Sequence, residues 1–259
     1  MLLIYTLIIL IATFFGATAG LGGGVIIKPL LDLIGYHSVS EISFFSSVAV
    51  FTMSIVAIIK QLKAGVKLDL LKVILIAFGS IVGGLLGSYI FSNLTSSDAL
   101  TKVQLIQSIL LLLIFILILI YSLIKSYLKT YQIKQPFIIF LIGVILGTIS
   151  VFLGIGGGPI NMAVLLLLFS LDLKQATVYS IAIIFFSQLA KLSSVLVNGS
   201  YLSYDLTFVP VICLSAIVGG YLGTLVNQKI TNRQITIIFV LMMISLILLT
   251  LYNIYSIIL

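Results

Sequence analysis

An apolar run of this chain is broken by Gly20-Leu21-Gly22-Gly23-Gly24-Val25-Ile26-Ile27-Lys28-Pro29, and the break recurs as Gly154-Ile155-Gly156-Gly157-Gly158-Pro159-Ile160-Asn161-Met162-Ala163. Each glycine inside a helix costs about 1 kcal/mol relative to alanine. Inside a bilayer, a broken helix also needs protein or a water-filled cavity around its freed backbone groups. Paired breaks at matching positions of two halves therefore predict a binding site near the middle of a membrane.

The composition assigns the chain to the membrane. Hydrophobic residues make up 62% of its 259 residues and charged residues 7%, whereas a soluble domain carries about 25% charged residues. We therefore expect a multi-pass protein of the cell membrane. The net charge of +7 does not indicate a nucleic-acid partner, because the basic residues gather near segment ends as in cytoplasmic loops. A lone Cys213 excludes an internal disulfide framework.

Eight apolar runs approach the length of about 20 residues that a bilayer crossing needs. They occupy 2–19, 39–59, 70–91, 103–124, 136–153, 175–197, 206–227 and 234–258. Two shorter runs, 24–36 and 158–171, follow the glycine stretches. At about 1.5 Å per residue, each of these is a short or partial crossing. The first twenty residues end like a signal peptide, but they lack its positive start, so we expect them to remain as the first helix.

The two halves of the sequence align. Gly20 corresponds to Gly154, an offset of 134 (154 − 20), and the same offset pairs Ser46 with Ser180. Further along, the offset becomes 136 and the glycines around Gly83 match those around Gly219. These later glycines are spaced for close helix packing. We expect an all-α polytopic fold with a first repeat over 1–130 and a second over 131–259.

Charge predicts the orientation of the segments. The lysine-rich loops 60–72 and 125–135 should be cytoplasmic, and the nearly neutral loop 92–102 external. In the second half the pattern reverses, because 198–205 carries one acid and 228–233 is basic. The reversal favours inverted repeats of five segments each, with both termini outside. A rival arrangement, four spans per half with re-entrant loops, would place 228–233 outside.

A helix that starts after a glycine break presents unpaired backbone amides at its positive end, which suits an anion. Lys28 could balance the anion's charge or extend to the cytoplasmic surface. Lys191 lies three residues after Gln188 on one helix face and either shares its role or approaches the outer surface. The predicted substrate-binding residues are Gly22, Gly23, Gly24, Lys28, Ser46, Ser47, Gly156, Gly157, Gly158, Asn161, Thr177, Ser180 and Gln188.

Several kinds of chemistry lack support in the sequence. The 6 acidic residues are scattered, and none pairs with another within a predicted span, which argues against a carboxylate proton relay or a cation pump. The chain contains no His/Cys cluster, phosphate-binding nucleotide loop or protease motif. We therefore predict that the chain is not an enzyme and has no metal or cofactor.

The glycine stretches, each followed by an apolar run and a hydroxyl-bearing helix, resemble the sulfite exporter TauE/SafE family over essentially the whole chain. The hydroxyl region departs from the family's adjacent Thr-Ser pair, because it reads Ala176-Thr177-Val178-Tyr179-Ser180 in one half and Ser46-Ser47 in the other. The resemblance implies an exporter or permease for sulfite, sulfonates or related sulfur-containing anions.

The leading hypothesis is a secondary transporter that exports such an anion by alternating access between the two halves. The alternatives are a passive anion channel and a membrane scaffold whose glycines serve packing alone. The partners of the predicted transporter would be the small anion and the lipid bilayer. The sequence leaves open a homodimer, the coupling ion, the substrate and the direction of transport.

Overall fold

The structure is a computed structural model that describes residues 1–65, 69–95, 100–124, 130–155 and 157–258. These residues form α-helices, two short 3₁₀ turns and connecting loops, with no β-strand among them. The first half contains α1 (Leu2–Ala19), α2 (Gly24–Ile34), α3 (Val39–Lys63), α4 (Leu70–Thr95) and α5 (Leu100–Ile124). The second contains α6 (Pro136–Leu153), α7 (Gly158–Phe169), α8 (Leu173–Val197), η2 (Ser200–Ser203), η3 (Leu206–Phe208), α9 (Val209–Lys229) and α10 (Asn232–Ile258).

Eight of these helical stretches are long and apolar enough to cross a membrane. They correspond to the eight long runs predicted from the sequence. Large apolar side chains on their outer faces are exposed, among them Phe78, Leu117 and Leu248. An apolar outer surface of this kind requires a hydrocarbon solvent, which confirms the prediction of a polytopic all-α membrane protein.

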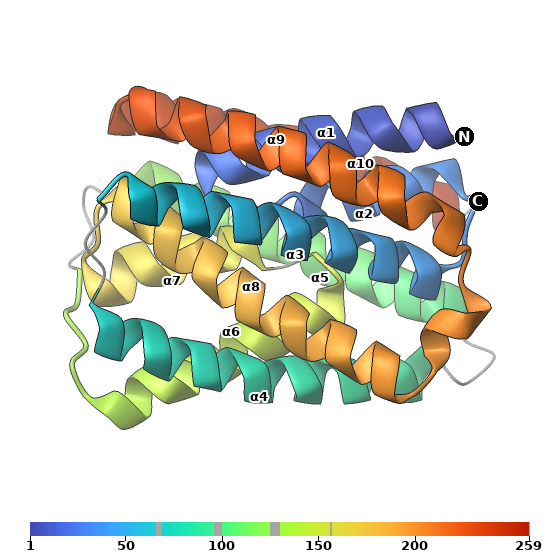
Figure 1. Cartoon of the computed structure of the whole chain (residues 1–259), viewed down its shortest axis with the longest axis horizontal. Coiled ribbons are helices and arrows are strands. Elements are labelled where there is room, and N and C mark those ends of the chain that lie inside the picture. Colours follow the sequence, from blue (N-terminus) through green and yellow to red (C-terminus); the bar gives the residue numbers. More distant parts are fainter. Residues whose placement is uncertain (66–68, 96–99, 125–129, 156, 259) are drawn as a thin grey trace.

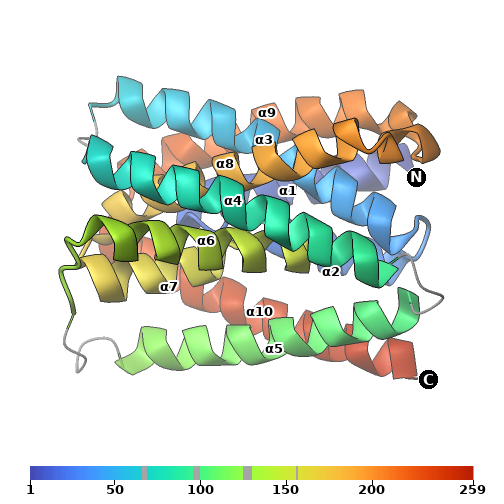
Figure 2. The ribbon, with the colours of Figure 1, turned by 90° about the horizontal axis from the view of Figure 1, so that it is seen from below.

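The long helices of the two halves run in opposite directions. In Figure 1, α3 runs from right to left and α8 from left to right, while α4 and α9 are likewise opposed. Both chain termini lie at the same end of the bundle (Figures 1 and 2). The opposite end carries the basic ends of α3 and α9, so we call it the inner end and the terminus-bearing end the outer end.

Glycine ends the first helix of each half in the same way. Gly20 after α1 and Gly154 after α6 adopt left-handed backbone conformations, with φ of 70° and 68°. Glycine favours this region because it has no Cβ to clash. The short helices α2 and α7 then start at Gly24 and Gly158. Pro159 occupies the first turn of α7, where its missing N–H leaves no bond unmade.

The short helices place both breaks inside the membrane. Helix α2 has 11 residues and α7 has 12, which at about 1.5 Å per residue is about 16–18 Å. That is little more than half of a hydrocarbon core about 30 Å thick. Helix α2 leads back to the outer end, where α3 begins (Figure 1). By this length α2 and α7 are partial crossings, so each break lies within the membrane-spanning part of the bundle.

Close helix packing fills the rest of the bundle. Helix α4 packs along α6, and α1 packs along α9. A Cβ on Gly83 would overlap the carbonyl oxygen of Val144, and one on Gly223 would overlap that of Phe14. These glycines therefore let backbones approach, as their spacing predicted. Helices α5 and α10 lie side by side along one edge of the bundle (Figure 2).

Candidate substrate site

The two glycine breaks contact each other at the centre of the bundle. A Cβ on Gly24 would overlap the carbonyl oxygen of Ile155, and a Cβ on Gly158 would overlap that of Leu21. The contacts are related by the offset of 134, since 24 pairs with 158 and 21 with 155. Because glycine has no side chain, the starts of α2 and α7 can approach each other this closely. The positive ends of both helices therefore lie at one place.

The serine mates Ser46 and Ser180 tie the halves together. The Ser46 hydroxyl donates to the carbonyl oxygen of Gly154 (3.1 Å), and the Ser180 hydroxyl donates to that of Gly20 (2.7 Å). All these residues are buried. Each half therefore supplies a hydroxyl to the broken helix end of the other half.

Two further predicted hydroxyls bond within their own helices. Ser47 donates to the Ser43 carbonyl (2.7 Å) and Thr177 to the Leu173 carbonyl (2.8 Å). Thr177 nevertheless lies beside the first break, because a Cβ on Gly20 would sit 2.8 Å from its Cα.

The remaining predicted glycines occupy different backbone conformations. Gly22 and Gly157 have positive φ, 65° and 69°, while Gly23 at the start of α2 is in the ordinary helical region. A Cβ on Gly157 would overlap the Ser150 hydroxyl, whose oxygen is buried without a hydrogen-bond partner. Gly156 lies outside the described residues.

Lys28 is neither free nor at the surface. Its side chain is 2% exposed, and its ammonium forms an ion pair with Asp32 at 2.9 Å. This pair spans one helical turn (i, i+4), a spacing that the sequence already contained. The charge that Lys28 could offer a substrate is therefore compensated by Asp32.

Two predicted amide side chains are buried with unmet hydrogen-bonding capacity. Asn161 is fully buried and neither its oxygen nor its nitrogen has a partner, and the Gln188 amide nitrogen is also unpartnered. A buried unpaired polar group costs about 1–3 kcal/mol, and native proteins keep such groups for a ligand, an ion or water. Both residues thus remain candidates for contacting a substrate.

Lys191 is the functional candidate that the sequence did not place in the site. Its side chain does not extend to the outer surface, since it is only 3% exposed. Its ammonium donates to both the carbonyl oxygen (3.1 Å) and the hydroxyl oxygen (2.5 Å) of Ser43. Ser43 in turn adjoins the second break, because a Cβ on Gly154 would lie 2.8 Å from its hydroxyl and 3.2 Å from the Lys28 side chain. The sequence contained one signal for this role, because a lysine within an apolar membrane helix marks a candidate functional site.

A polar cavity of about 560 Å³, the outer cavity, opens at the outer end between α3, α4 and α8. It is lined by Ser38, Ser40, Phe44, Ser88, Phe91, Ser92, Lys191, Ser194, Val195, Asn198, Ser200, Ser203 and Tyr204. Burial, and then nearby Glu41, raise the pKa of Tyr204, so its hydroxyl stays protonated. Lys191 lies two turns before the end of α8, about 10 Å deeper than Asn198.

A second cavity, of about 510 Å³, lies at the inner end between α3 and α9. This inner cavity is lined by Val56, Ile59, Lys60, Lys63, Ala64, Tyr221 and Gln228. At the repeat offsets, Lys60 corresponds to Ser194 and Gln228 to Ser92 (60 + 134 and 228 − 136). The two cavities therefore occupy related positions at opposite ends of the bundle.

A chain of hydrogen-bonded polar groups, which we call the inner seal, leads from the inner cavity toward the first break. The Gln61 amide donates to Asn227 (2.9 Å), and the Asn227 amide donates to the carbonyl oxygen of Thr18 (2.7 Å), two residues before the first break. All three are buried. At the outer end, the repeat mates of Gln61 and Asn227 are Val195 and Phe91, which cannot make the same bonds.

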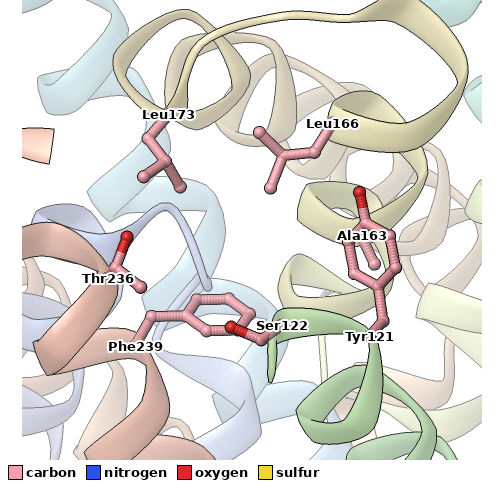
Figure 3. A pocket seen from close by; sticks show the side chains of 7 residues that line it. All are labelled: Tyr121, Ser122, Ala163, Leu166, Leu173, Thr236 and Phe239. Atoms are coloured by element: carbon pink, nitrogen blue, oxygen red, sulfur yellow. The ribbon is translucent and has the colours of Figure 1, made fainter. Parts of the chain in front are cut away.

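A third space lies away from these elements. It is lined by residues of α5, α7, α8 and α10, including Tyr121, Leu166 and Phe239 (Figure 3). At about 10 Å³ it holds at most one water molecule, so it is too small for an anionic substrate.

Two short helices whose broken starts meet inside an apolar bundle, with a cavity at each of its ends, are typical of a multi-pass membrane transporter. The chain belongs to the sulfite exporter TauE/SafE family, which matches residues 5–250. It is also 28% identical over 250 residues to the probable membrane transporter protein YunE of Bacillus subtilis (strain 168), covering 88% of this chain and 89% of that relative. No solved structure matches the chain. The protein is therefore a multi-pass transporter of the plasma membrane, as predicted.

Proposed function

We propose that this protein is a secondary transporter that exports a small sulfur-containing anion, sulfite or an organosulfonate, by alternating access. The observation that carries the proposal is the contact between the two breaks at the centre of the bundle, with cavities at repeat-related positions at its two ends. A carrier needs one central site and two closable paths to it. The family supplies the sulfur-anion class.

In the proposed cycle, the anion binds at the amides of Gly22–Gly24 and Gly156–Gly158, at or just before the starts of α2 and α7. The Gly22 amide, which donates to the Gly16 carbonyl (3.3 Å), would be released from that bond. Asn161 and Gln188, whose amides are buried and unpartnered, complete its shell when the breaks separate. Ser46, Ser47, Thr177 and Ser180 line the same region. Because Gly24 and Gly158 now pack against the facing break, substrate binding requires the two halves, 1–130 and 131–259, to move apart slightly.

The inner seal favours a carrier over a permanently open channel. In the proposed cycle, the hydrogen bonds among Gln61, Asn227 and the Thr18 carbonyl close the inner path while the outer cavity is open. The structure in this conformation corresponds to the outward-facing state of the proposed cycle. Steady single-channel conductance of the purified protein in planar bilayers would instead support the channel alternative.

The test is efflux of sulfite and sulfoacetate from proteoliposomes that contain the full chain. Replacing Gly23 with valine places a branched side chain against Ala12 and Thr13 at the start of α2, so Gly23→Val should abolish efflux while the protein still inserts. Gly35→Ala is the control, because Gly35 has open space around it. Full efflux by Gly23→Val would refute the role of the first break.

The substrate itself is identified by thermal unfolding with sulfite, sulfate, thiosulfate, taurine, sulfoacetate and chloride. A ligand that binds only the folded state stabilises it by RT ln(1 + [L]/Kd). We expect stabilisation by one sulfur oxyanion and none by chloride. A flat response to every anion would contradict the proposed substrate class.

A further inference from the structure

The ammonium group of Lys191 is buried without a compensating charge. The ammonium donates to the carbonyl and the hydroxyl of Ser43, and both of these groups are neutral. Among the described residues no carboxylate lies within ion-pair distance of it. Taking a charge out of water costs several kcal/mol unless an opposite charge or hydrogen bonds offset the loss. The site therefore favours any anion that can reach this group.

The described carboxylates all have other roles. Asp32 pairs with Lys28, and Asp69 pairs with Lys72. Asp172 and Asp205 accept bonds from backbone amides that follow them, and Glu41 accepts from the amide of Asp205. Of the two buried lysines among the described residues, Lys28 is therefore neutralised internally, whereas Lys191 is left for a partner from outside.

The outer cavity gives an anion access to Lys191. Apart from Lys191, its polar lining consists of serine and tyrosine hydroxyls and the Asn198 amide, and no acidic residue is among the described residues that line it. Ser88 and Ser194 are paired through their hydroxyls at 3.1 Å, so their protons can turn toward an incoming oxygen atom. A volume of about 560 Å³ easily admits a small oxyanion with its hydration water.

We propose that Lys191, with the hydroxyls of Ser43, Ser88 and Ser194, forms an anion-binding site at the bottom of the outer cavity. Its ligand is a small oxyanion that carries an SO₃ group, and this choice of ligand rests on the proposed function. Because Ser43 adjoins Gly154, the site lies next to the central breaks, on their side toward the outer end of the bundle. An exported anion would occupy it after leaving the breaks and before reaching the medium.

The first test measures binding of sulfoacetate, sulfate and chloride to the purified full chain by isothermal titration calorimetry. Removing a charged hydrogen-bond donor from such a site weakens binding by about 10- to 100-fold, so Lys191→Gln should show that loss. Lys191→Arg should bind with most of the affinity of the unmodified protein. Lys60→Gln, at the inner cavity, is the matched control and should bind as the unmodified protein does.

A thermal-unfolding readout separates a binding role from a structural one. If Lys191 only holds Ser43 in place, Lys191→Gln lowers the unfolding temperature without anion and leaves the anion-dependent rise intact. The proposal predicts the opposite: an unfolding temperature that is unchanged or higher without anion, and no rise with sulfoacetate. The first pattern would overturn the proposal.

The second test reads the electrostatics of the cavity directly. Ser194→Cys, in a Cys213→Ser background, is labelled from outside intact cells with an anionic or a cationic methanethiosulfonate reagent. We expect the anionic reagent to react faster, sulfoacetate to slow it, and Lys191→Gln to abolish both effects. Equal rates for the two reagents, unaffected by Lys191→Gln, would overturn the proposal.

The outcomes distinguish this site from the proposed transport function. If Lys191→Gln loses binding and labelling preference while the protein exports none of the sulfur anions, the outer site stands and the transport proposal fails. If efflux depends on Gly23 but Lys191→Gln binds anions and labels as the unmodified protein does, the outer site fails and the transport proposal stands.

Discussion

At the scale of single residues, two serine hydroxyls hold the centre of the molecule. Ser46 and Ser180 each donate to the carbonyl at the broken helix end in the opposite half. Those carbonyls come at helix C-termini, where the next turn cannot supply an amide. The hydroxyls therefore satisfy groups that would otherwise be buried and unpaired.

Ser46→Ala and Ser180→Ala should each destabilise the protein by about 1–3 kcal/mol, because each leaves a buried carbonyl without its partner. Ser47→Ala is the matched control. Its hydroxyl is equally buried but bonds back to Ser43 in the same helix, so it should cost about 0.5 kcal/mol or less. Thermal unfolding in detergent measures all three, and equal losses would contradict the role of the cross-half bonds.

The buried ion pair gives a second prediction at this scale. Asp32→Asn leaves the Lys28 ammonium buried and unpaired and should cost about 3–5 kcal/mol. Removing both charges with Lys28→Met and Asp32→Asn should recover much of that loss. The exposed pair Asp69–Lys72 is the control, since Asp69→Asn should cost less than about 1 kcal/mol. A mild effect of Asp32→Asn in unfolding experiments would argue that Lys28 has another anionic partner.

At the scale of elements, the decisive units are the two helix–break–helix pairs, α1–α2 and α6–α7. Each first helix ends in a left-handed glycine, and each second helix returns to the end of the bundle from which the first one starts. The breaks therefore meet backbone to backbone, and small changes in them should act on the whole interface between the halves.

Gly20→Ala tests this interface against Gly35→Ala. Both glycines end helices with nearly equal φ, 70° and 64°, so both substitutions carry about 1–2 kcal/mol of backbone strain. A Cβ on Gly20 also meets the Thr177 backbone at 2.8 Å, whereas one on Gly35 meets no atom within 4 Å. Gly20→Ala should lose about 1–3 kcal/mol more, measured by thermal unfolding. Equal losses of stability in the two variants would show that the interface accommodates the added methyl group at Gly20 without cost.

At the scale of the whole molecule, the asymmetry between the two ends is the notable feature. The halves place related cavities at both ends, but only at the inner end do Gln61, Asn227 and the Thr18 carbonyl form a chain of hydrogen bonds. In the proposed cycle this chain closes the inner path. The corresponding outer positions, Val195 and Phe91, lack such groups. The balance between outward- and inward-facing states should therefore depend on Asn227.

Asn227→Ala removes two buried hydrogen bonds, worth about 1–2 kcal/mol in total, and should raise the inward-facing population by about 5- to 30-fold. The readout is labelling of Ala57→Cys from the inner side, in a Cys213→Ser background. Ala57 is fully buried and is the repeat mate of Lys191 (57 + 134). Gln228→Ala, which removes only two long bonds at the rim, should have little effect. Unchanged labelling in Asn227→Ala would exclude this seal as the inner gate.

Much of the fold follows from the sequence alone. The membrane class, the eight long spans, the two short segments and their pairing across the halves follow from hydropathy and glycine spacing, which act locally along the chain. Helix ends differ from the predicted runs by a few residues, because caps and not hydropathy set them. Helix α2, for example, ends at Ile34 with Gly35 in a left-handed conformation.

The candidate site depended on the tertiary structure. The sequence pointed to the breaks and to Ser46 and Ser180, but it could not show that each serine bonds to the opposite half. It left Lys191 out of the site, because only the packing of α8 against α3 brings its ammonium to Ser43. The reason is physical: a buried polar group must find a partner, and residues more than a hundred positions apart become partners only through helix packing.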